Sequence, residues 1–474
     1  MSKLDSWETI ILVCVFCALE AIASPAQTFN NLLSFNGTDG EAPYYGSLVQ
    51  GLDADLYGTT LGGGEYGRGT IFKATAAGKL TTLYSFCAEK SCLDGSTPVA
   101  GLLLANNGNF YGTTTAGGAY NNGTVFKTTS TGTLTVLYSF CHATTCPDGE
   151  APFAGLIQGS NGNLYGTTEY GGAHADGGQG GTVFEITPGG ILTTLYSFCA
   201  EKNCLDGSRP FGELIQAANG NFYGTTYRGG TNNLGTVFEI TPAGTLTTVH
   251  SFDGTDGELP VAGLVQAANG NFYGTTMEGG ADAKGTVFEI TPAGALTTLH
   301  SFDITDGGYP YAPLIQATDG NFYGTTYSYG NAPNAEGTVF KITPAGTLTT
   351  LHNFLGTDGD HPYAGLLQAT NGTFYGTASA GGADNDGTVF SLSVGLSPFV
   401  KTLPASGAVG TPVTILGSNL TGATSVTFNG TAATFKIVSS TEITSTVPKG
   451  ATTGPMKVKT PSGTLTSNAN FQVP

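Results

Sequence analysis

Charged residues are few in this sequence, because Asp, Glu, Lys and Arg make up only 11% of its 474 residues. Strong helix formers are also scarce, and no stretch after the N-terminus has the apolar spacing of an amphipathic helix. Thr, Val, Phe and Tyr instead alternate with Gly, Asn, Asp and Pro, which is typical of short strands joined by tight turns. The composition therefore excludes a helical protein and predicts an all-β one.

The signature motifs of several enzyme classes are missing. The sequence contains no G-x-S-x-G nucleophile elbow, no P-loop and no pair of histidines at a metal-binding spacing. On the basis of motifs we therefore expect no catalytic residue, no metal and no cofactor.

Basic residues are outnumbered, and the formal net charge is −18. The acidic excess lies between residues 39 and 386, whereas the segment from residue 396 onward carries five lysines and one acid. An acidic surface of this kind repels phosphate groups. Nucleic acid and anionic membranes are therefore excluded as expected partners.

Long apolar runs are absent except near the N-terminus. Residues 10–19 are apolar and are followed by Ala-Ile-Ala at 21–23, the arrangement of a signal peptide and its cleavage site. The run is too short for a transmembrane helix, which needs about 20 apolar residues. We interpret residues 1–26 as a signal peptide and expect a protein that is secreted or displayed on the cell surface, with no membrane insertion after cleavage.

A block of about 50 residues recurs along most of the chain. A fixed period of this length indicates a repeat architecture in which no single unit buries its own apolar face. Each copy divides into four short strands; in the copy at 260–310 they are predicted at 261–267, 271–276, 285–291 and 295–302. Four antiparallel strands of this length are typical of a propeller blade. The Tyr-Gly pair of the seven copies begins at Tyr57, Tyr111, Tyr165, Tyr223, Tyr273, Tyr323 and Tyr375.

The two ends of the repeat region are cut out of phase. The region starts at 28–35 with the fourth strand of a copy and ends at 387–394 with a third strand that lacks its fourth. A ring can use this cut, because the N-terminal strand completes the last sheet and removes an open edge. We therefore predict that residues 28–394 form a seven-bladed β-propeller, and we expect a monomer.

The repeat also separates two faces of such a ring. The turns between the first and second strands and between the third and fourth are short and nearly identical in all copies. We call their side the turn face. The other connections, which carry the cysteines and the variation in length, share what we call the loop face. A ligand site is expected on the loop face or in the channel mouth.

Six cysteines outside the N-terminal segment form three copies of one spacing, each just after the Ser-Phe pair of a repeat. This identical spacing favours local disulfides. A structural metal site would instead require Cys-x-x-Cys with a partner pair or histidines. The expected bonds are Cys87–Cys92, Cys141–Cys146 and Cys199–Cys204.

Two sets of repeated residues invite a catalytic interpretation, but equivalent copies have equivalent environments, and paired catalytic acids need different ones. We expect the aspartates of the Asp-Gly pairs to accept hydrogen bonds from backbone N–H groups in their turns. They are Asp39, Asp94, Asp148, Asp206, Asp256, Asp306 and Asp358. A second set shares one place in the fourth strand, where we expect packing: Tyr84, Tyr138, Tyr196, His250, His300 and His352.

Residues that break the repeat are better functional candidates, because symmetry does not account for them. They would give an irregular polar and aromatic surface suited to carbohydrate or peptide. Neutral variation of solvated loops is the alternative for each residue taken singly. The candidate ligand-binding residues are Arg209, Glu213, Arg228, Tyr309 and His361.

The repeated pattern GNFYGTT…GTVF…DG..P over residues 28–394 resembles the GloVer tandem repeat. The resemblance implies a secreted bacterial protein with one of several surface anchors. Residues 397–474 are similar to the IPT/TIG domain in the run Gly410–Leu420, in Phe428-Asn429-Gly430 and in Val447-Pro448. That similarity implies an immunoglobulin-like β-sandwich, and the segment itself predicts six or seven short strands.

Two functions are compatible with these features. The favoured one is a non-catalytic binding or scaffold protein whose propeller face contacts an extracellular glycan or a surface protein. The alternative is an extracellular carbohydrate-active enzyme, a glycan hydrolase or lyase, with its site at the channel mouth. A hydrolase needs two carboxylates, about 5 Å or about 6.5–9.5 Å apart according to its stereochemistry. Glu213 is the one candidate at the channel mouth, and it has no evident partner.

Overall fold

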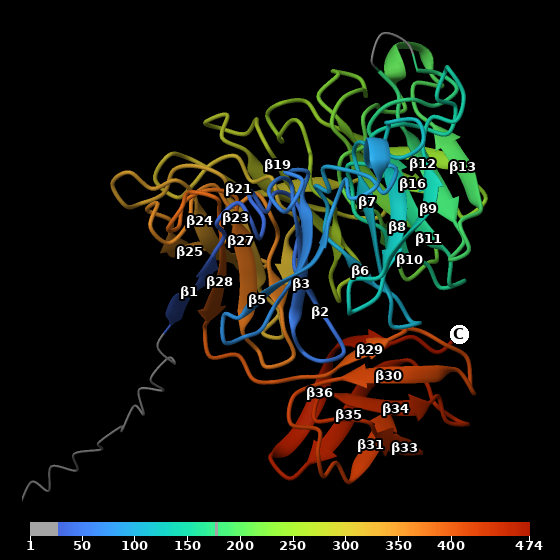
Figure 1. Ribbon diagram of the computed structural model, residues 1–474, viewed down its shortest axis with the longest axis vertical. Coiled ribbons are helices and arrows are strands. Elements are labelled where there is room, and N and C mark those ends of the chain that lie inside the picture. Colours follow the sequence, from blue (N-terminus) through green and yellow to red (C-terminus); the bar gives the residue numbers. More distant parts are fainter. Residues whose placement is uncertain (1–26, 176–178) are drawn as a thin grey trace, which may run out of the picture.

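The computed structural model describes residues 27–175 and 179–474, so the predicted signal peptide at 1–26 lies outside the described residues. The regular elements of the described chain are β-strands and two short 3-10 helices, η1 (Lys90–Cys92) and η2 (Lys202–Cys204) (Figure 1). The prediction of an all-β protein is confirmed. In the described ranges, no helix is long and apolar enough to cross a membrane.

The repeat region forms seven antiparallel sheets of four strands each, arranged as a β-propeller (Figure 1). The first strands are β2 (Val49–Gln50), β6 (Leu103–Leu104), β10 (Ile157–Gln158), β14 (Ile215–Gln216), β18 (Val265–Gln266), β22 (Ile315–Gln316) and β26 (Leu367–Gln368). The second strands are β3 (Leu56–Thr60), β7 (Phe110–Thr114), β11 (Leu164–Thr168), β15 (Phe222–Thr226), β19 (Phe272–Thr276), β23 (Phe322–Thr326) and β27 (Phe374–Ala378). The third strands are β4 (Thr70–Ala74), β8 (Thr124–Thr128), β12 (Thr182–Ile186), β16 (Thr236–Ile240), β20 (Thr286–Ile290), β24 (Thr338–Ile342) and β28 (Thr388–Ser393). The fourth strands are β5 (Leu80–Ser85), β9 (Leu134–Ser139), β13 (Leu192–Ser197), β17 (Leu246–Ser251), β21 (Leu296–Ser301), β25 (Leu348–Asn353) and the N-terminal β1 (Thr28–Ser34).

The first strand of each repeat is shorter than the sequence predicts. The run at 261–267 forms a strand only at Val265–Gln266. Segments of adjacent repeats converge here, and a Cβ on Gly263 would lie only 2.7 Å from the backbone oxygen of Glu213. The start of the run therefore follows the adjacent repeat instead of pairing within its own sheet.

The two ends of the repeat region meet in one sheet. β1 pairs antiparallel with β28, from Thr28 opposite Ser393 to Ser34 opposite Thr388. The prediction that the N-terminal strand completes the last sheet is confirmed. On the turn face, Gln50 of the first repeat accepts a hydrogen bond from the backbone N–H of Thr370 in the last repeat, at 3.0 Å.

Apolar contacts between successive repeats explain why these sheets stack. The Tyr of one Tyr-Gly pair packs against the second-strand Phe of the next repeat, as in Tyr57 and Phe110, whose ring centroids are 4.3 Å apart. Both rings are buried. Within a repeat, the following glycine leaves room for a third-strand ring, because a Cβ on Gly58 would lie 2.7 Å from Phe72. Each sheet therefore depends on its neighbour for part of its core.

Disulfide bonds close three of the loops that follow the fourth strands, on the loop face. They join Cys87 to Cys92, Cys141 to Cys146 and Cys199 to Cys204. This is the local pairing that the repeated spacing predicts. η1 and η2 lie inside the first and third of these loops.

The C-terminal segment forms two further four-stranded sheets around one core. Val413 and Ile415 from one sheet and Val426 and Phe428 from the other are buried together. The segment has eight strands, and not six or seven, because the chain changes sheet after β32, so that a single apparent run yields two strands. The first sheet contains β29 (Lys401–Leu403), β30 (Pro412–Leu416), β34 (Glu442–Thr446) and β33 (Phe435–Ile437), and the second β32 (Thr431–Ala433), β31 (Ser425–Phe428), β35 (Gly454–Thr460) and β36 (Gly463–Phe471).

The C-terminal sheets lie against the turn face of the propeller, whereas the long loops project from its other side (Figure 1). The Thr441 hydroxyl donates a hydrogen bond to the backbone oxygen of Leu52 at 2.8 Å. Leu416 is buried in the same apolar cluster as Leu102 and Leu104 of the propeller. The C-terminal domain therefore covers the face with nearly identical turns and leaves the loop face open.

Deleting residues 28–36 should destabilise the whole propeller, because β28 would become an open edge with unpaired backbone groups. We expect aggregation and a lower melting temperature, measured by light scattering and calorimetry, relative to a matched chain that begins at residue 27. A monomeric deletion variant with an unchanged melting temperature would contradict this role of β1.

Reducing the three disulfides should loosen their loops without melting the propeller. Each bond closes a loop of only a few residues, so its loss costs about 2 kcal/mol on the chain-entropy estimate. The inter-repeat core does not depend on these bonds. Hydrogen exchange should accelerate at 87–92, 141–146 and 199–204 while the β circular dichroism signal is retained; cooperative unfolding on reduction is the contrary result.

Candidate functional site

Aromatic side chains gather at the end of the channel that faces away from the C-terminal domain. Most follow the proline of a fourth-to-first-strand loop, and two follow the second strand of a repeat. Each ring is partly buried and keeps some exposure. We call these residues the aromatic belt: Tyr44, Tyr45, Phe153, Phe211, Tyr227, Tyr311, Tyr327 and Tyr363.

Ring contacts join the belt across several repeats. Phe211 contacts Phe153 at 4.6 Å and Tyr227 at 5.4 Å between ring centroids. On the other side, Tyr363 contacts Tyr327 at 4.6 Å and Tyr44 at 4.2 Å. The belt therefore forms one connected surface from residues that are far apart in the sequence.

Tyr45 bridges the two sides of the belt. Its ring centroid lies 4.9 Å from that of Phe153, 5.9 Å from Tyr311 and 5.3 Å from Tyr363. Burial raises the pKa of the Tyr45 hydroxyl well above its usual range. Tyr45 belongs to an insertion of one residue, because four residues separate Pro43 from Leu48 where the other copies have three. The first repeat thus fills the channel mouth in a way that the other repeats do not.

The same insertion breaks a hydrogen bond that recurs between repeats. In six repeats a threonine of the second strand donates to a backbone oxygen of the next repeat, as Thr59 donates to Ala100 at 2.7 Å. The seventh threonine, Thr377, is buried, and its hydroxyl has no hydrogen-bond partner in the described part of the chain. By analogy, the acceptor of Thr377 would be a backbone oxygen of the first repeat, which carries the insertion. The symmetry of the channel mouth is therefore broken at the junction of the last and first repeats.

Arg209 and Arg228 lie at the edge of the belt and share one aromatic ring. Their guanidinium groups lie 5.1 Å and 5.0 Å from the ring centroid of Tyr227. Arg209 also donates hydrogen bonds to the carboxylate of Glu169 and to the Tyr170 hydroxyl, the latter at 2.9 Å. Glu169 is only 6% exposed. This ion pair fixes Arg209 beside the belt, whereas Arg228 has no ion-pair partner among the described residues.

Tyr309 and His361 occupy the same position in their repeats as Arg209. The Lys284 ammonium donates to the Tyr309 hydroxyl at 2.8 Å. His361 stacks on Tyr327 with ring centroids 4.4 Å apart. All three residues have φ near +55° before a proline, but so do Thr97 and Leu259, so this strained conformation belongs to the repeat and not to a site.

Glu213 lies apart from the other four candidates, inside the channel. It lines a cavity of only about 30 Å³ beneath Tyr45, Phe153 and Phe211. A Cβ on Gly155 would lie 2.1 Å from Glu213 Oε1, so the carboxylate occupies the space that this glycine leaves. Burial alone raises the Glu213 pKa to about 7. Among the described residues Glu213 belongs to no ion pair, and no neighbouring carboxylate contributes to that shift.

The aspartates of the seven Asp-Gly pairs all accept hydrogen bonds from backbone N–H groups of their own loops. Six of them also bind the Tyr or His of the preceding fourth strand. The Tyr84 hydroxyl donates to Asp94 at 2.8 Å, and His250 Nε2 lies 2.7 Å from Asp256. The packing interpretation of this position is therefore incomplete. The sequence contains a signal for the missing part, because Tyr accompanies the long disulfide loops and His the short ones.

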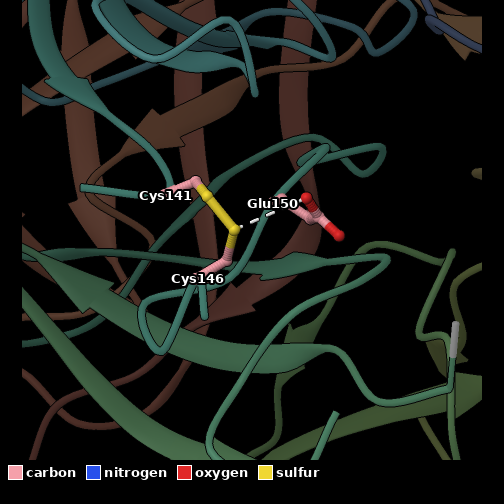
Figure 2. Close-up of side chains that lie close together, drawn as sticks. All are labelled: Cys141, Cys146 and Glu150. Carbon is pink, nitrogen blue, oxygen red and sulfur yellow. Dashed lines mark hydrogen bonds between the residues drawn. A yellow bond between two sulfur atoms is a disulfide. The ribbon is translucent and has the colours of Figure 1, made fainter. Parts of the chain in front are cut away.

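Within the described residues, three metal-ligating side chains come close together at one place, Cys141, Cys146 and Glu150 (Figure 2). Glu150 Oε2 lies 3.6 Å from Cys146 Sγ. The two sulfurs are bonded to each other, so neither offers the thiolate that a metal requires. This cluster is a disulfide loop and not a metal centre.

The partly buried ring of His352 should make the folded protein less stable in mild acid. Its ring stacks on Phe29 of β1 with centroids 3.5 Å apart. Burial lowers the His352 pKa, although Asp358 opposes the shift. Because the folded-state pKa lies below the unfolded value of about 6.5, the stabilisation is complete above that pH and declines as the pH falls below it.

The measurement is the melting temperature between about pH 5 and pH 8, where an unperturbed His titrates. The His352→Tyr variant, which places a Tyr where three other repeats have one, should show a weaker pH dependence than the wild type. His300→Tyr is the matched control, because His300 and His352 make the same edge contact with Phe302 and Phe354, and only His352 also stacks on Phe29. Equal slopes in all three proteins would contradict the assignment to His352.

Comparison with known proteins identifies a repeat family and solved structures of similar fold. The sequence matches the Gloeobacter/Verrucomicrobia repeat family over residues 21–214, 93–269, 178–390 and 260–435. No curated protein matches it. The structure is similar to a fungal alcohol oxidase of the AA5 family in complex with copper, with a TM-score of 0.50, 14% identity and coverage of 91% of this chain and 98% of that one.

Two bacterial gluconolactonases are more distant. For the periplasmic enzyme of Pseudomonas aeruginosa the TM-score is 0.43 at 16% identity, covering 72% of this chain and 97% of that one. For the Xanthomonas campestris enzyme the TM-score is 0.40 at 11% identity, covering 78% of this chain and 90% of that one. Likeness at such identities concerns the fold alone. The family matches, however, span more than half of the sequence, and this chain belongs to the Gloeobacter/Verrucomicrobia repeat family.

Proposed function

We propose that this protein is a secreted or cell-surface binding protein that holds an extracellular glycan at the aromatic belt without converting it. The observation that carries the proposal is the connected surface of partly exposed aromatic rings at the open channel mouth. Aromatic rings offer flat apolar faces, and tyrosine adds a hydroxyl that can hydrogen-bond, which suits the mixed surface of a sugar.

Four polar residues beside the aromatic belt, which we call the rim residues, support the same ligand class: Arg209, Arg228, Tyr309 and His361. Arg228 has no carboxylate partner among the described residues, and Arg209 is oriented by Glu169. The Tyr309 hydroxyl and the His361 ring add further hydrogen-bonding groups beside the belt. A few positioned polar groups around an apolar surface are typical of sites that fix the orientation of a small ligand. A surface protein is the other partner class, and it is an outcome of the test below.

We also propose that the propeller is a closed ring of seven blades and that residues 397–474 form an immunoglobulin-like domain of the IPT/TIG type. The seven four-stranded sheets and the bond between Gln50 and Thr370 support the ring. Two four-stranded sheets around one core support the second assignment. Export is supported by the three disulfides, because such bonds persist in oxidising compartments.

Glycan hydrolysis is the alternative function. A pKa of about 7 would suit Glu213 as a general acid. A hydrolase of this type also needs a second carboxylate at a defined distance, and neighbouring charge makes no contribution at Glu213. Binding without turnover is therefore the better-supported function.

The test is a glycan and surface-protein array probed with the chain that begins at residue 27. Alanine at Arg209, Arg228, Tyr309 or His361 should each weaken glycan binding, by about tenfold where a charged hydrogen bond of an arginine is lost and by less at Tyr309 and His361. Asp256→Ala is the matched control on the loop face. It should lower stability by about 1 kcal/mol, by analogy with the loss of a cap, and leave binding intact.

Three outcomes would overturn this proposal. Unchanged glycan binding by a variant with all four rim residues replaced would place the ligand elsewhere. Binding to a surface protein but to no glycan would show that the ligand is a protein and not a glycan. Glycan cleavage that is abolished by Glu213→Gln in a folded protein would establish the enzyme instead.

A further inference from the structure

A second and larger cavity, of about 400 Å³, lies at the other end of the channel, where the C-terminal domain covers it. Its walls are mostly apolar and come from the first strands of several repeats and from the residues just before them, with Leu102, Leu156 and Leu367 among them. Its floor is formed by β29 and by residues 467–470 of β36. A groove of about 560 Å³ between the two domains shares Leu403 and Asn470 with this cavity and reaches exposed residues. The cavity therefore has an apolar interior and a path to solvent.

Two side chains of opposite charge line this cavity, Glu213 from the propeller and Lys401 from β29. The Lys401 ammonium donates a hydrogen bond to the backbone oxygen of Gln368 at 2.9 Å and lies 5.7 Å from the ring centroid of Phe399. Among the described residues neither Glu213 nor Lys401 belongs to an ion pair. Each charge therefore lacks a neutralising partner within residues 27–175 and 179–474.

The electrostatics of the two groups agree with this geometry. Burial raises the pKa of Glu213 to about 7 and lowers the pKa of Lys401 to about 8. Glu213 and Lys401 form no ion pair with each other across the cavity. Two uncompensated charges next to apolar walls are unfavourable in the empty protein. A ligand that carries both complementary charges would remove this cost.

We propose that this cavity binds a small zwitterion with an apolar body, of the class of apolar amino acids and short apolar peptides. Its ammonium group faces Glu213, its carboxylate faces Lys401, and its side chains pack against the leucine walls. The volume lies within the range of ligand pockets, about 300–1,000 Å³. This site is separate from the aromatic belt and does not depend on the proposed glycan binding.

The probes are L-leucine and L-leucyl-L-leucine, titrated calorimetrically into the chain that begins at residue 27. Two analogues isolate the charges, since 4-methylpentanoate lacks the ammonium and 3-methylbutylamine lacks the carboxylate. At least one zwitterion should bind, and each analogue at least tenfold more weakly. The better of the two zwitterions defines the spacing of the charges and thus distinguishes the amino acid from the peptide.

Two neutral variants, Glu213→Gln and Lys401→Met, test the residues. Each should weaken zwitterion binding at least tenfold, to the level of the analogue that lacks the matching charge. The melting temperature of the unliganded variants should stay the same or rise, because an uncompensated charge has been removed. The exposed residues Glu65 and Lys436 provide the matched control variants, Glu65→Gln and Lys436→Met, which should bind like the wild type.

Several results would overturn the proposal. They are the absence of binding by both zwitterions at millimolar concentration, equal binding of zwitterions and single-charge analogues, and a marked drop in melting temperature in both neutral variants. The last result would mean that Glu213 and Lys401 stabilise the fold. Glycan binding measured on Lys401→Met separates this proposal from the previous one, because the variant should lose the zwitterion and keep the glycan.

Discussion

The stacking of each repeat on the next is the interaction on which the rest of the structure depends. A single four-stranded sheet leaves both faces apolar, and the buried Tyr of one repeat completes its packing against the Phe of the next, as Tyr57 does against Phe110. A row of such sheets would end in two open apolar faces and an open edge. The pairing of β1 with β28 removes the edge, and the bond from Gln50 to Thr370 joins the terminal repeats.

This constraint divides the molecule into parts that are free to change and parts that are not. The turns opposite the long loops are short and nearly identical, and the C-terminal domain packs on them through contacts such as Thr441 with Leu52. The loop face has no such cover. Length changes are tolerated there, including the disulfide loops, because loops contribute little to the inter-repeat core. The asymmetry between the two faces therefore follows from the way the repeats pack.

Local and periodic features could be predicted from the sequence, and features built across the channel could not. The strand order, the disulfides and the closure by residues 28–35 follow from spacing within or between copies. The aromatic belt was missed, although most of its residues follow the loop prolines, because the meeting of several repeats at one channel mouth is a property of the three-dimensional arrangement. Glu213 breaks the repeat as the other four candidates do, and the sequence therefore places it with them at the channel mouth, whereas the structure places it inside the channel.

The two ends of the channel have different chemistry because symmetry is broken separately at each. At the open end, one inserted residue places Tyr45 across the mouth and leaves the Thr377 hydroxyl without the acceptor that its six counterparts have. At the covered end, the C-terminal domain contributes Lys401 opposite the apolar first strands, and one repeat contributes Glu213 where the others have Gly, Ser or Pro. Tyr45 and its neighbours leave a cavity of only about 30 Å³ at Glu213, far smaller than the cavity of about 400 Å³ at the covered end. Sevenfold repetition thus supplies the scaffold, and its few exceptions supply two separate places where specific recognition can occur.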